Sequence, residues 1–353
     1  MEFLIGTPCK RDYKEIKESI YCTHLNMDFK NKNILITGGL GFLGSNLAIR
    51  LVSEGANVTI IDNLNPAYGG NKYNIEEVKN NVKIIIGDIR DEQLMSEMIL
   101  GMNIVFLFAA QVSYIDSLAI PFEDLELNAK STLTILELCR RLNPNVKIVF
   151  SSSRMVLGKI LMVNYDEEAP TNQLSLYGIH KLASEKYLLM YYKDFGIKST
   201  IFRITNPYGP RQQIKHSNYS LPGWFIRCAM EGQTIKIFGE GNQIRDYVFG
   251  KDIVESMLLC IMNAESNGEI INMGSGCMSS FKEMVYNVVE TVGKGDVIHI
   301  PWPDNYERVE TGDSIPDLSK LKRFSGYIPI TNLKEGIRKT FEYYKKEWKN
   351  YVR

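Results

Sequence analysis

The sequence of 353 residues has few of the side chains that build metal sites. It holds four histidines (His24, His180, His216 and His299), none at metal-ligand spacing, and six cysteines without a CxxC pair. Most cysteines lie within apolar runs, such as Cys260 in residues 257–260. We therefore expect reduced thiols in the core and predict no metal site.

The chain also lacks a net charge and a long apolar run. Its 41 basic and 41 acidic residues balance without a block of like charge, which argues against a nucleic-acid or anionic-membrane surface. No apolar stretch reaches the ~18 residues that a membrane span needs, and charged residues interrupt the N-terminus. We expect a cytoplasmic protein that acts on a small molecule, with neither nucleic acid nor membrane as partner.

Short apolar runs alternate with helical segments through the first half of the chain. Such near-continuous hydrophobic runs are typical of parallel strands that are covered on both faces. A helix is expected from Ser45 to Glu54, after the first run. We predict an α/β fold with a Rossmann-type doubly wound parallel sheet, whose strands include residues 34–36, 58–61, 82–86, 104–108 and 146–150.

Three segments divide the chain. Residues 1–31 precede the first strong strand and form an N-terminal appendage. Residues 32–205 form the Rossmann domain. After residue 180 the regularity changes, and residues 206–246 contain many Gly, Pro, Asn and aromatic residues. Residues 206–353 are expected to form mainly a smaller, mixed α/β substrate-binding lobe, with later segments returning to the Rossmann domain.

A glycine-rich turn follows the first strand. Gly38, Gly41 and Gly44 stand where side chains would block a closely bound pyrophosphate. Backbone N–H groups of this turn, which also contains Phe42 and Leu43, would then hold the phosphates at the helix N-terminus. The alternative is a glycine-rich turn that binds no ligand. The surrounding sequence has to distinguish these two interpretations.

An acidic residue lies where a dinucleotide ribose would bind. Asp62 ends the second strand, 24 residues after Gly38, close to the ~20-residue offset of a ribose-binding carboxylate. A carboxylate accepts hydrogen bonds from the ribose 2′-OH but repels a 2′-phosphate, which favours NAD over NADP. Asn63 is expected to assist. Asp88 and Ile89, after the third strand, would flank the adenine or simply form a strand-end turn.

A phenol and an ammonium group stand four residues apart on one predicted helix. Tyr177 and Lys181 therefore share a helix face, although spacing alone also fits a solvated face. A lysine cation and the nicotinamide charge would favour the tyrosinate, which could take a hydroxyl proton during hydride transfer. Ser153 follows a strand that ends at the expected ligand crevice and could hydrogen-bond the substrate oxygen.

From about Lys32 onward the sequence resembles the extended short-chain dehydrogenase/reductases that act on nucleotide sugars. The TGGxGFxG turn of that family appears at residues 37–44, its SSSxxVYG segment at 151–158, and its YxxxK motif at Tyr177 and Lys181. The resemblance implies NAD as cofactor, held partly by the same Tyr177 and Lys181, and a nucleoside-diphosphate sugar as substrate.

The resemblance also assigns cofactor and substrate contacts by motif. Ala109, Ala110 and Gln111 would face the cofactor, and Asn128 would support the catalytic helix. The substrate ligands that it implies are Asn206 and Arg211 of the NxYGPR segment, Arg245 of the GxQxRD segment on the diphosphate, and the loosely aligned Arg308. Family members commonly pair through two helices, here near residues 120–142 and 177–194, so a homodimer is expected.

The residues after Ser153 bear on the reaction. The family's shared first step oxidises C4 of the hexose, and similar 4,6-dehydratases then use an Asp-Glu pair, whereas decarboxylases use a Glu. This chain has Arg154 and Met155 instead. Without an acid for a leaving hydroxyl, the simplest outcome is return of the hydride to the other face of C4. A 4-epimerase is the first interpretation. A 2-epimerase, a 4,6-dehydratase, a net NAD-dependent dehydrogenase and a non-catalytic NAD-binding regulator remain alternatives.

Overall fold

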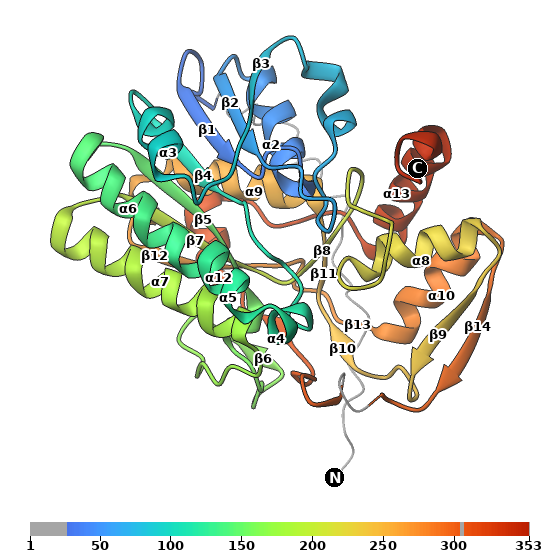
Figure 1. Cartoon of the computed structure of the whole chain (residues 1–353). Coiled ribbons are helices and arrows are strands. Elements are labelled where there is room, and N and C mark those ends of the chain that lie inside the picture. The colour runs from blue at the N-terminus through green and yellow to red at the C-terminus, as the bar shows by residue number, and fades with distance from the viewer. Residues whose placement is uncertain (1–26, 304–306, 353) are drawn as a thin grey trace.

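The computed structural model describes residues 27–303 and 307–352, and a seven-stranded sheet lies at its centre (Figure 1). Every neighbouring pair in this sheet is parallel. In spatial order the strands are β12 (Glu269–Met273), β7 (Ser199–Ile204), β5 (Lys147–Ser153), β4 (Ile104–Leu107), β1 (Asn33–Thr37), β2 (Asn57–Asp62) and β3 (Val82–Ile86). The strand order reverses beside β1, which confirms the predicted doubly wound Rossmann-type sheet.

Helices cover both faces of the sheet. One hydrophobic core includes α2 (Phe42–Ser53), α9 (Gly250–Met262) and α12 (Ser319–Ser325), and the other includes α3 (Glu92–Ile99), α6 (Ser131–Leu142) and α7 (Leu176–Phe195). Figure 1 shows α3, α6 and α7 side by side on the same face. Ile34, Leu35 and Ile36 of β1 are fully buried, because a strand covered on both faces has no solvent side.

One strand is longer than its apolar run. The run at residues 146–150 predicts a strand that ends at Phe150, but β5 continues to Ser153. Its last residues pair with β7, Ser152 opposite Arg203 and Ser153 opposite Ile204. The extension is polar because it leaves the core and enters the ligand end of the sheet. Ser153 is therefore held by the ladder itself.

A second group of elements forms a smaller lobe at the right of Figure 1. Its core is built from β9 (Thr234–Phe238), β14 (Asp296–Ile300), α8 (Leu221–Met230), α10 (Phe281–Val292) and α13 (Leu333–Glu347). Between these segments the chain returns to the large sheet to add β12 and α9. The boundary near residue 205 therefore stays an interpretation of a chain that crosses between two cores.

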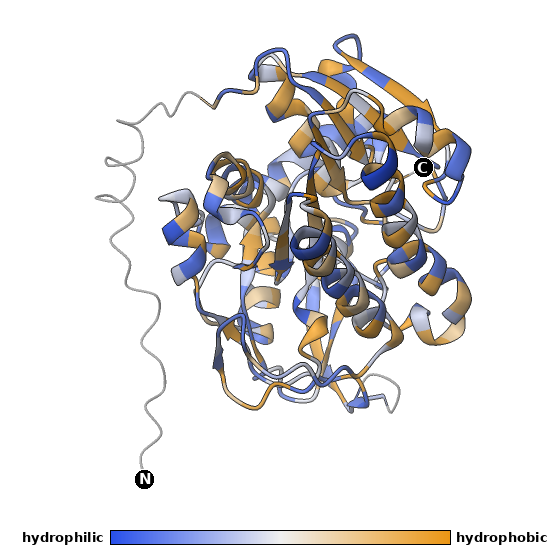
Figure 2. Ribbon diagram, turned by 90° about the vertical axis from the view of Figure 1, so that its left-hand side faces the viewer, coloured by the Kyte–Doolittle hydropathy of each residue, from blue (hydrophilic) through white to orange (hydrophobic). Residues whose placement is uncertain are grey.

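Short elements connect the lobes and complete the loops. They are β6 (Asn164–Tyr165) with β15 (Ile315–Pro316), β8 (Asn206–Tyr208) with β11 (Tyr247–Phe249), β10 (Ile244–Arg245) with β13 (Ser279–Ser280), α4 (Asp116–Ala119), α5 (Pro121–Leu125), the 3₁₀ turns η1 (Lys72–Val78), η3 (Arg154–Val156), η4 (Ala264–Ser266) and η5 (Trp348–Asn350), and a π-helical turn η2 (Glu126–Lys130). Figure 2 shows hydrophobic colouring concentrated on the strands and mixed colouring on the outer helices. Within residues 27–303 and 307–352, no helix combines the length and apolarity of a membrane span.

The cysteines follow the sequence-based expectation only in part. Cys139, Cys228 and Cys260 are free and buried. Cys277 is disulfide-bonded, so the prediction of a reduced thiol is wrong there; it lies partly exposed in the turn after β12, not in an apolar run. Cys9 and Cys22 lie outside the described residues, as do residues 1–26 of the predicted appendage.

Candidate functional site

A cavity of about 710 Å³ lies between the carboxyl ends of the sheet strands and the smaller lobe. Helix α8 and strand β9 of that lobe contribute to its wall. The predicted site residues that line it are Gly38, Gly41, Phe42, Leu43, Gly44, Asp62, Asn63, Ile89, Ala109, Ala110, Ser153, Tyr177, Lys181, Asn206 and Arg245. Residues spread over more than 200 positions of the chain thus meet in one space.

The glycine turn is shaped for a closely bound ligand. Gly38 has a φ of 66°, and a Cβ there would lie 2.8 Å from the backbone N of Ala109. A Cβ at Gly44 would overlap the carbonyl oxygen of Gly38, so this glycine lets α2 pack against the turn. Gly41 is the N-cap of α2 and provides no capping side chain. The first amide groups of α2 therefore face the cavity and are suited to phosphate oxygens.

Asp62 ends β2 and lines the cavity, and its predicted contact with a ribose stays a prediction. Its carboxylate accepts hydrogen bonds from the backbone N of Leu40 (3.1 Å) and of Leu64 (2.9 Å), which fix it at the end of β2. Burial raises the pKa of this carboxyl against the effect of these two hydrogen bonds. The group that would bind a ribose hydroxyl is thus held in place before any ligand arrives.

Asp88 does not line the cavity. Its carboxylate receives two hydrogen bonds from the Arg90 guanidinium, at 2.9 and 2.8 Å, and one from the amide of Asn63 at 2.9 Å. The Arg90 hydrogen bond is the main reason why the pKa of Asp88 falls to about 2. Asp88 thus holds the side chain of Asn63, and Ile89 is the neighbour that reaches the cavity wall, so the adenine contact of Asp88 stays a prediction.

Tyr177, Lys181 and Ser153 meet at the cavity wall. The Nζ of Lys181 lies 6.0 Å from the centre of the Tyr177 ring and donates a hydrogen bond to the carbonyl oxygen of Ser151 at 3.0 Å. The hydroxyl of Ser153 lies within hydrogen-bonding reach of the phenol. The predicted proton-transfer group is therefore assembled on one wall, with the serine and the phenol facing the same space.

Burial shifts the two titrating groups in opposite directions. It raises the pKa of Tyr177 to about 12, although the Ser153 hydrogen bond acts to lower it, and it lowers the pKa of Lys181 to about 8. In the chain by itself, burial outweighs the hydrogen bond from Ser153, so the phenol is less acidic than a free tyrosine. The expected effect of Lys181 and the nicotinamide charge on the tyrosinate stays a prediction. A further positive charge beside the phenol is required to offset its burial.

Buried polar contacts orient the helix that carries this pair. Ser175 caps α7 by accepting a hydrogen bond from the N–H of Gly178 (3.2 Å). Ser184 donates to the carbonyl oxygen of Asn128 (2.6 Å) on the π-helical turn η2, and the amide of Asn128 donates to the carbonyl oxygen of Gln111 (2.9 Å). Asn128 thus contacts the catalytic helix, as predicted from the resemblance.

Gln111 does not line the cavity, so its predicted cofactor contact stays a prediction. Its side chain is fully buried and donates to the carbonyl oxygen of Ser113 at 2.7 Å, whereas Ala109 and Ala110 line the cavity. The buried carboxylate of Asp124 contacts Asn128 at 3.0 Å and His180 at 2.5 Å. The sequence pattern contains no signal for Asp124, because its partners come from two separate helices.

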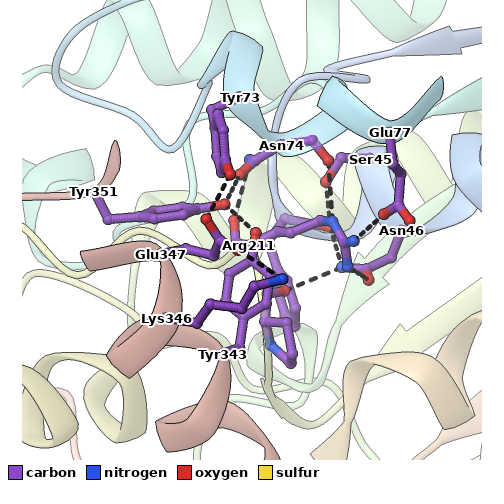
Figure 3. A network of polar contacts seen from close by, with 12 residues as sticks. Ser45, Asn46, Tyr73, Asn74, Glu77, Arg211, Tyr343, Lys346, Glu347 and Tyr351 are labelled. Carbon is purple, nitrogen blue, oxygen red and sulfur yellow. Dashed lines mark hydrogen bonds and ion pairs between the residues drawn. The ribbon is translucent and has the colours of Figure 1, made fainter. Parts of the chain in front are cut away.

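Arg211 does not line the cavity and belongs to the network of polar contacts in Figure 3, so its predicted substrate contact stays a prediction. Its φ of 73° turns the side chain toward α2 and η1. There the guanidinium donates to the carbonyl oxygen of Asn74 and to Oδ1 of Asn46, both at 3.0 Å, and forms an ion pair with Glu77. It also lies 5.4 Å from the ring centre of Tyr343. Arg211 fastens the smaller lobe to the sheet, whereas Asn206 of the same motif reaches the cavity.

Arg245 lines the cavity and Arg308 does not. The Arg245 guanidinium donates to the carbonyl oxygens of Ile244 (2.8 Å) and Gly312 (3.0 Å) and pairs with the Glu310 carboxylate. Arg308 is exposed and does not line the cavity, so its predicted ligand contact stays a prediction. In that segment Glu310 and Thr311 line the cavity instead, and the loose local alignment gave no signal for them.

Aromatic side chains form the end of the cavity in the smaller lobe. Phe238 and Trp302 lie 5.6 Å apart between ring centres, and Trp224, Phe225 and Phe281 line the same region. Flat rings of this kind provide stacking surface for a nucleobase. None of them belongs to a short motif, so sequence reasoning missed them.

The carboxylates that line the cavity are already bound. Among the described residues of the wall, the acidic side chains are Asp62 and Glu310. Asp62 is held by two backbone N–H groups, and Glu310 by Arg245 and the N–H of Gly312 (2.9 Å). The segment after Ser153 places Arg154 and Met155 at the wall. Within this described wall, no unbound acid lies beside the phenol.

Comparison with known proteins agrees with this geometry. Residues 34–274 match the model of the NAD dependent epimerase/dehydratase family. The chain is 33% identical to a putative UDP-glucose 4-epimerase of Methanocaldococcus jannaschii, over 88% of this chain and 98% of that protein. It is 31% identical to a UDP-N-acetyl-alpha-D-glucosaminuronate decarboxylase of Bacillus cytotoxicus, over 89% and 98%. The UDP-glucose 4-epimerase of Thermotoga maritima, solved with UDP-glucose, superposes with a TM-score of 0.82 at 30% identity and covers 90% of this chain and 99% of that one.

Proposed function

The chain belongs to the NAD-dependent epimerase/dehydratase family, and from this premise we propose that it inverts C4 of a nucleoside-diphosphate hexose through a 4-keto intermediate. Two relatives and a solved structure with this kind of substrate match almost the whole length of the chain. The 4-epimerase is the specific reaction that the cavity supports best.

The cavity fits a dinucleotide at its sheet end. Gly38 and Gly44 leave the space that a Cβ would fill, the N-terminus of α2 has no capping side chain, and the Asp62 carboxylate lines the cavity at the end of β2, where it could accept a hydrogen bond from a ribose. When bound, NAD supplies a hydride acceptor and a positive charge beside the phenol. Burial raises the pKa of Tyr177 to about 12, and a positive charge beside the phenol lowers this pKa because it stabilises the tyrosinate.

The side chains of the chain then perform the proton transfer. The Ser153 hydroxyl orients the sugar hydroxyl toward the phenol, and Tyr177 takes the proton at its hydroxyl oxygen. Lys181 holds a cation close to the ring and is itself fixed by the carbonyl oxygen of Ser151. When the hydride returns to the other face of C4, Tyr177 gives the proton back and the configuration is inverted.

One observation supports a 4-epimerase most strongly: both carboxylates in the described part of the cavity wall already have hydrogen-bond or ion-pair partners within the protein. Elimination of a hydroxyl needs a nearby acid to protonate the leaving group. Here Asp62 and Glu310 are occupied by backbone N–H groups and by Arg245, and the positions after Ser153 hold Arg154 and Met155. Return of the hydride is the reaction that these side chains can complete without such an acid.

The proposal is tested by incubating the purified protein with UDP-, GDP-, CDP- and dTDP-hexoses. The product is followed by proton NMR, and net NADH by its absorbance. We expect an isomer inverted at C4 without net NADH. Accumulated NADH would favour a dehydrogenase, a deoxy-keto product a dehydratase, and inversion at C2 a 2-epimerase.

We propose a homodimer that pairs through the predicted helices near residues 120–142 and 177–194. Large apolar side chains on α5 and α7 are exposed in the single chain, with Phe122 80%, Ile179 47% and Met190 45% accessible. Exposed apolar groups on neighbouring helices support a contact that excludes water. The cytoplasmic location stays a prediction.

A further inference from the structure

Arg154 is a buried cation on the cavity wall. The residue is 9% exposed, and its Nη1 donates a hydrogen bond to the hydroxyl of Thr311 at 2.7 Å. Among the described residues, no carboxylate forms an ion pair with it. A guanidinium has five N–H donors, so most of them are left for a group inside the cavity.

The surroundings of Arg154 do not favour its charge. Burial and the like charge of Arg245 both act to lower its pKa. The nearby Glu310 carboxylate is already bound by Arg245 and by the N–H of Gly312. Replacing an unpaired buried charge by an apolar group usually stabilises a fold. A role in folding therefore does not account for the presence of Arg154, whereas a ligand anion does.

The position of Arg154 points to the sugar end of the cavity. It directly follows Ser153, whose hydroxyl lies at the phenol of Tyr177 and so at the carbon that reacts. The aromatic end, with Phe238 and Trp302, belongs to the smaller lobe. An anion beside Arg154 would thus sit on the hexose, away from the nucleobase.

We propose that Arg154 binds a carboxylate carried by the hexose, so that the preferred substrate is a nucleoside-diphosphate sugar with an acidic hexose, such as a uronic acid. The inference rests on the proposed function, since it names the substrate class of the same site. A guanidinium matches a carboxylate through two parallel N–H···O bonds, which gives both attraction and orientation. Arg154 then selects the substrate, and Ser153 and Tyr177 act on its C4.

The test measures binding in the NAD-loaded Tyr177→Phe protein, in which no turnover interferes. Calorimetry gives the affinities for UDP, UDP-glucose and UDP-glucuronate, and for the matching series of another nucleoside if the hexose panel selects one. We expect the uronate to bind more tightly than the neutral sugar. Adding Arg154→Met should weaken uronate binding roughly 10- to 100-fold more than binding of the neutral sugar, the usual effect of one charged hydrogen-bonding partner.

Two further variants test whether the effect of Arg154→Met comes from the lost charge at this position or from a disturbed fold. Lys159→Met removes an exposed cation five residues away and should leave the preference for the uronate unchanged. Arg154→Lys keeps the positive charge but lacks the planar guanidinium that donates two parallel hydrogen bonds. It should therefore retain part of the preference for the uronate. The melting temperature of Arg154→Met should equal or exceed that of the parent, because an unpaired buried charge is removed.

The outcomes distinguish this inference from the proposed function. A parent protein that epimerises neutral sugars without any preference for the uronate would overturn the inference alone. Equal losses for UDP, UDP-glucose and the uronate in Arg154→Met would also overturn it, because they would make Arg154 a diphosphate ligand. A protein that neither binds nor converts any sugar of the panel would refute the proposed function itself.

Discussion

At the residue scale, the chemistry depends on a phenol that burial makes less acidic. The Tyr177 hydroxyl has its pKa raised to about 12, and its polar neighbour in the wall is Ser153. Removing this hydroxyl takes away the proton acceptor but leaves the ring in place. Tyr177→Phe should therefore lower kcat about 10²- to 10⁴-fold, the usual contribution of a positioned acid-base group.

The same variant should still bind NAD, because the glycine turn and Asp62 are untouched. Product formation by NMR and the cofactor content of the purified protein measure the two effects separately. A Tyr177→Phe protein with a nearly normal rate would show that another group transfers the proton. Loss of NAD together with loss of the fold would leave the Tyr177 role unsupported, and Ser153→Ala then provides a second test of the same wall.

Lys181 gives the activity a pH dependence. Burial lowers its pKa to about 8, so its cation is present below that pH and is lost as the pH rises through it. We expect kcat/KM to fall above about pH 8. Lys181→Arg keeps the charge at all these pH values and should move this fall to higher pH. A wild-type profile that stays flat to pH 10 would contradict the assignment.

The effect of Lys181 on stability has the opposite sign. Its pKa is lower in the folded than in the unfolded protein, so between about pH 8 and the ordinary lysine value near 10.4 the unfolded state binds more protons. The contribution of this group to the free energy of unfolding therefore increases with pH in that window. Urea titrations at pH 7.5 and pH 10 give the free energy of unfolding of the wild type and of Lys181→Met. The contribution of Lys181 to the change between the two pH values should be missing in the variant.

The sequence could predict residues of short motifs but not residues that meet from distant segments. Tyr177, Lys181 and Ser153 reach one wall because motif spacing records their neighbours along the chain. Arg211 has a motif too, yet its positive φ directs it to η1 and α2. That direction depends on contacts more than 130 positions away, which the motif does not contain.

At the element scale, the strand-turn-helix unit of β1 and α2 depends on Gly44. Alanine favours a helix interior over glycine by about 1 kcal/mol, but a Cβ here would overlap the carbonyl oxygen of Gly38. Backbone cannot move aside as a flexible side chain does, so the clash should exceed the helix preference. Gly44→Ala should destabilise the protein by about 1–3 kcal/mol in urea unfolding.

Gly69→Ala is the matched control for Gly44→Ala. A Cβ at Gly69 would meet the Gln213 side chain at an ordinary 3.7 Å, without a left-handed φ. Its effect should stay within about 0.5 kcal/mol. Equal effects of the two substitutions would show that the close approach at Gly44 is not what requires glycine.

Helix α7 is fixed to the sheet by a buried ion pair. The Glu185 carboxylate receives hydrogen bonds from Nη2 of Arg203 (2.8 Å) and from the Ser152 hydroxyl (2.6 Å), and Arg203 also donates to the carbonyl oxygen of Glu167 (2.8 Å). Glu185→Ala leaves a buried guanidinium without its carboxylate and should cost about 3–5 kcal/mol. Combining it with Arg203→Met should recover part of this loss, and a double variant no more stable than Glu185→Ala would contradict the pairing argument.

Apolar runs predicted the positions of the central strands: the run at residues 34–36 lies inside β1, where it is buried. The run at residues 82–86 coincides with β3, although this edge strand is only partly buried. The end of β5 was predicted too early because its serines pair with β7 while carrying no apolar signal. Periodicity records burial, so a polar strand end at a ligand site escapes it.

At the scale of the whole molecule, the exposed apolar side chains of α5 and α7 bear on assembly. Combining Phe122→Asp with Ile179→Asp places charges on both helices and should convert a dimer into a monomer by light scattering at micromolar concentration. Leu161→Asp changes a residue that is 72% exposed outside these helices and should leave the mass unchanged. A wild-type protein that is monomeric at this concentration would refute the dimer.

The two-lobe architecture was only partly visible in the sequence. The sheet follows from alternating runs, but the return of β12 beside β7 joins residues about 70 positions apart. The aromatic end of the cavity likewise unites Phe238 with Trp302 through the pairing of β9 and β14. Such pairings depend on the packing of the complete chain, and no local window of sequence contains them.

The central claim, inversion of C4 by return of the same hydride, is tested most directly with a nucleoside-diphosphate hexose that carries deuterium at C4. The account predicts a product inverted at C4 that retains the deuterium there, with no uptake of solvent hydrogen at any ring carbon. Loss of the label to released NADH, solvent hydrogen at C5 or C6, or inversion at a carbon other than C4 would contradict it.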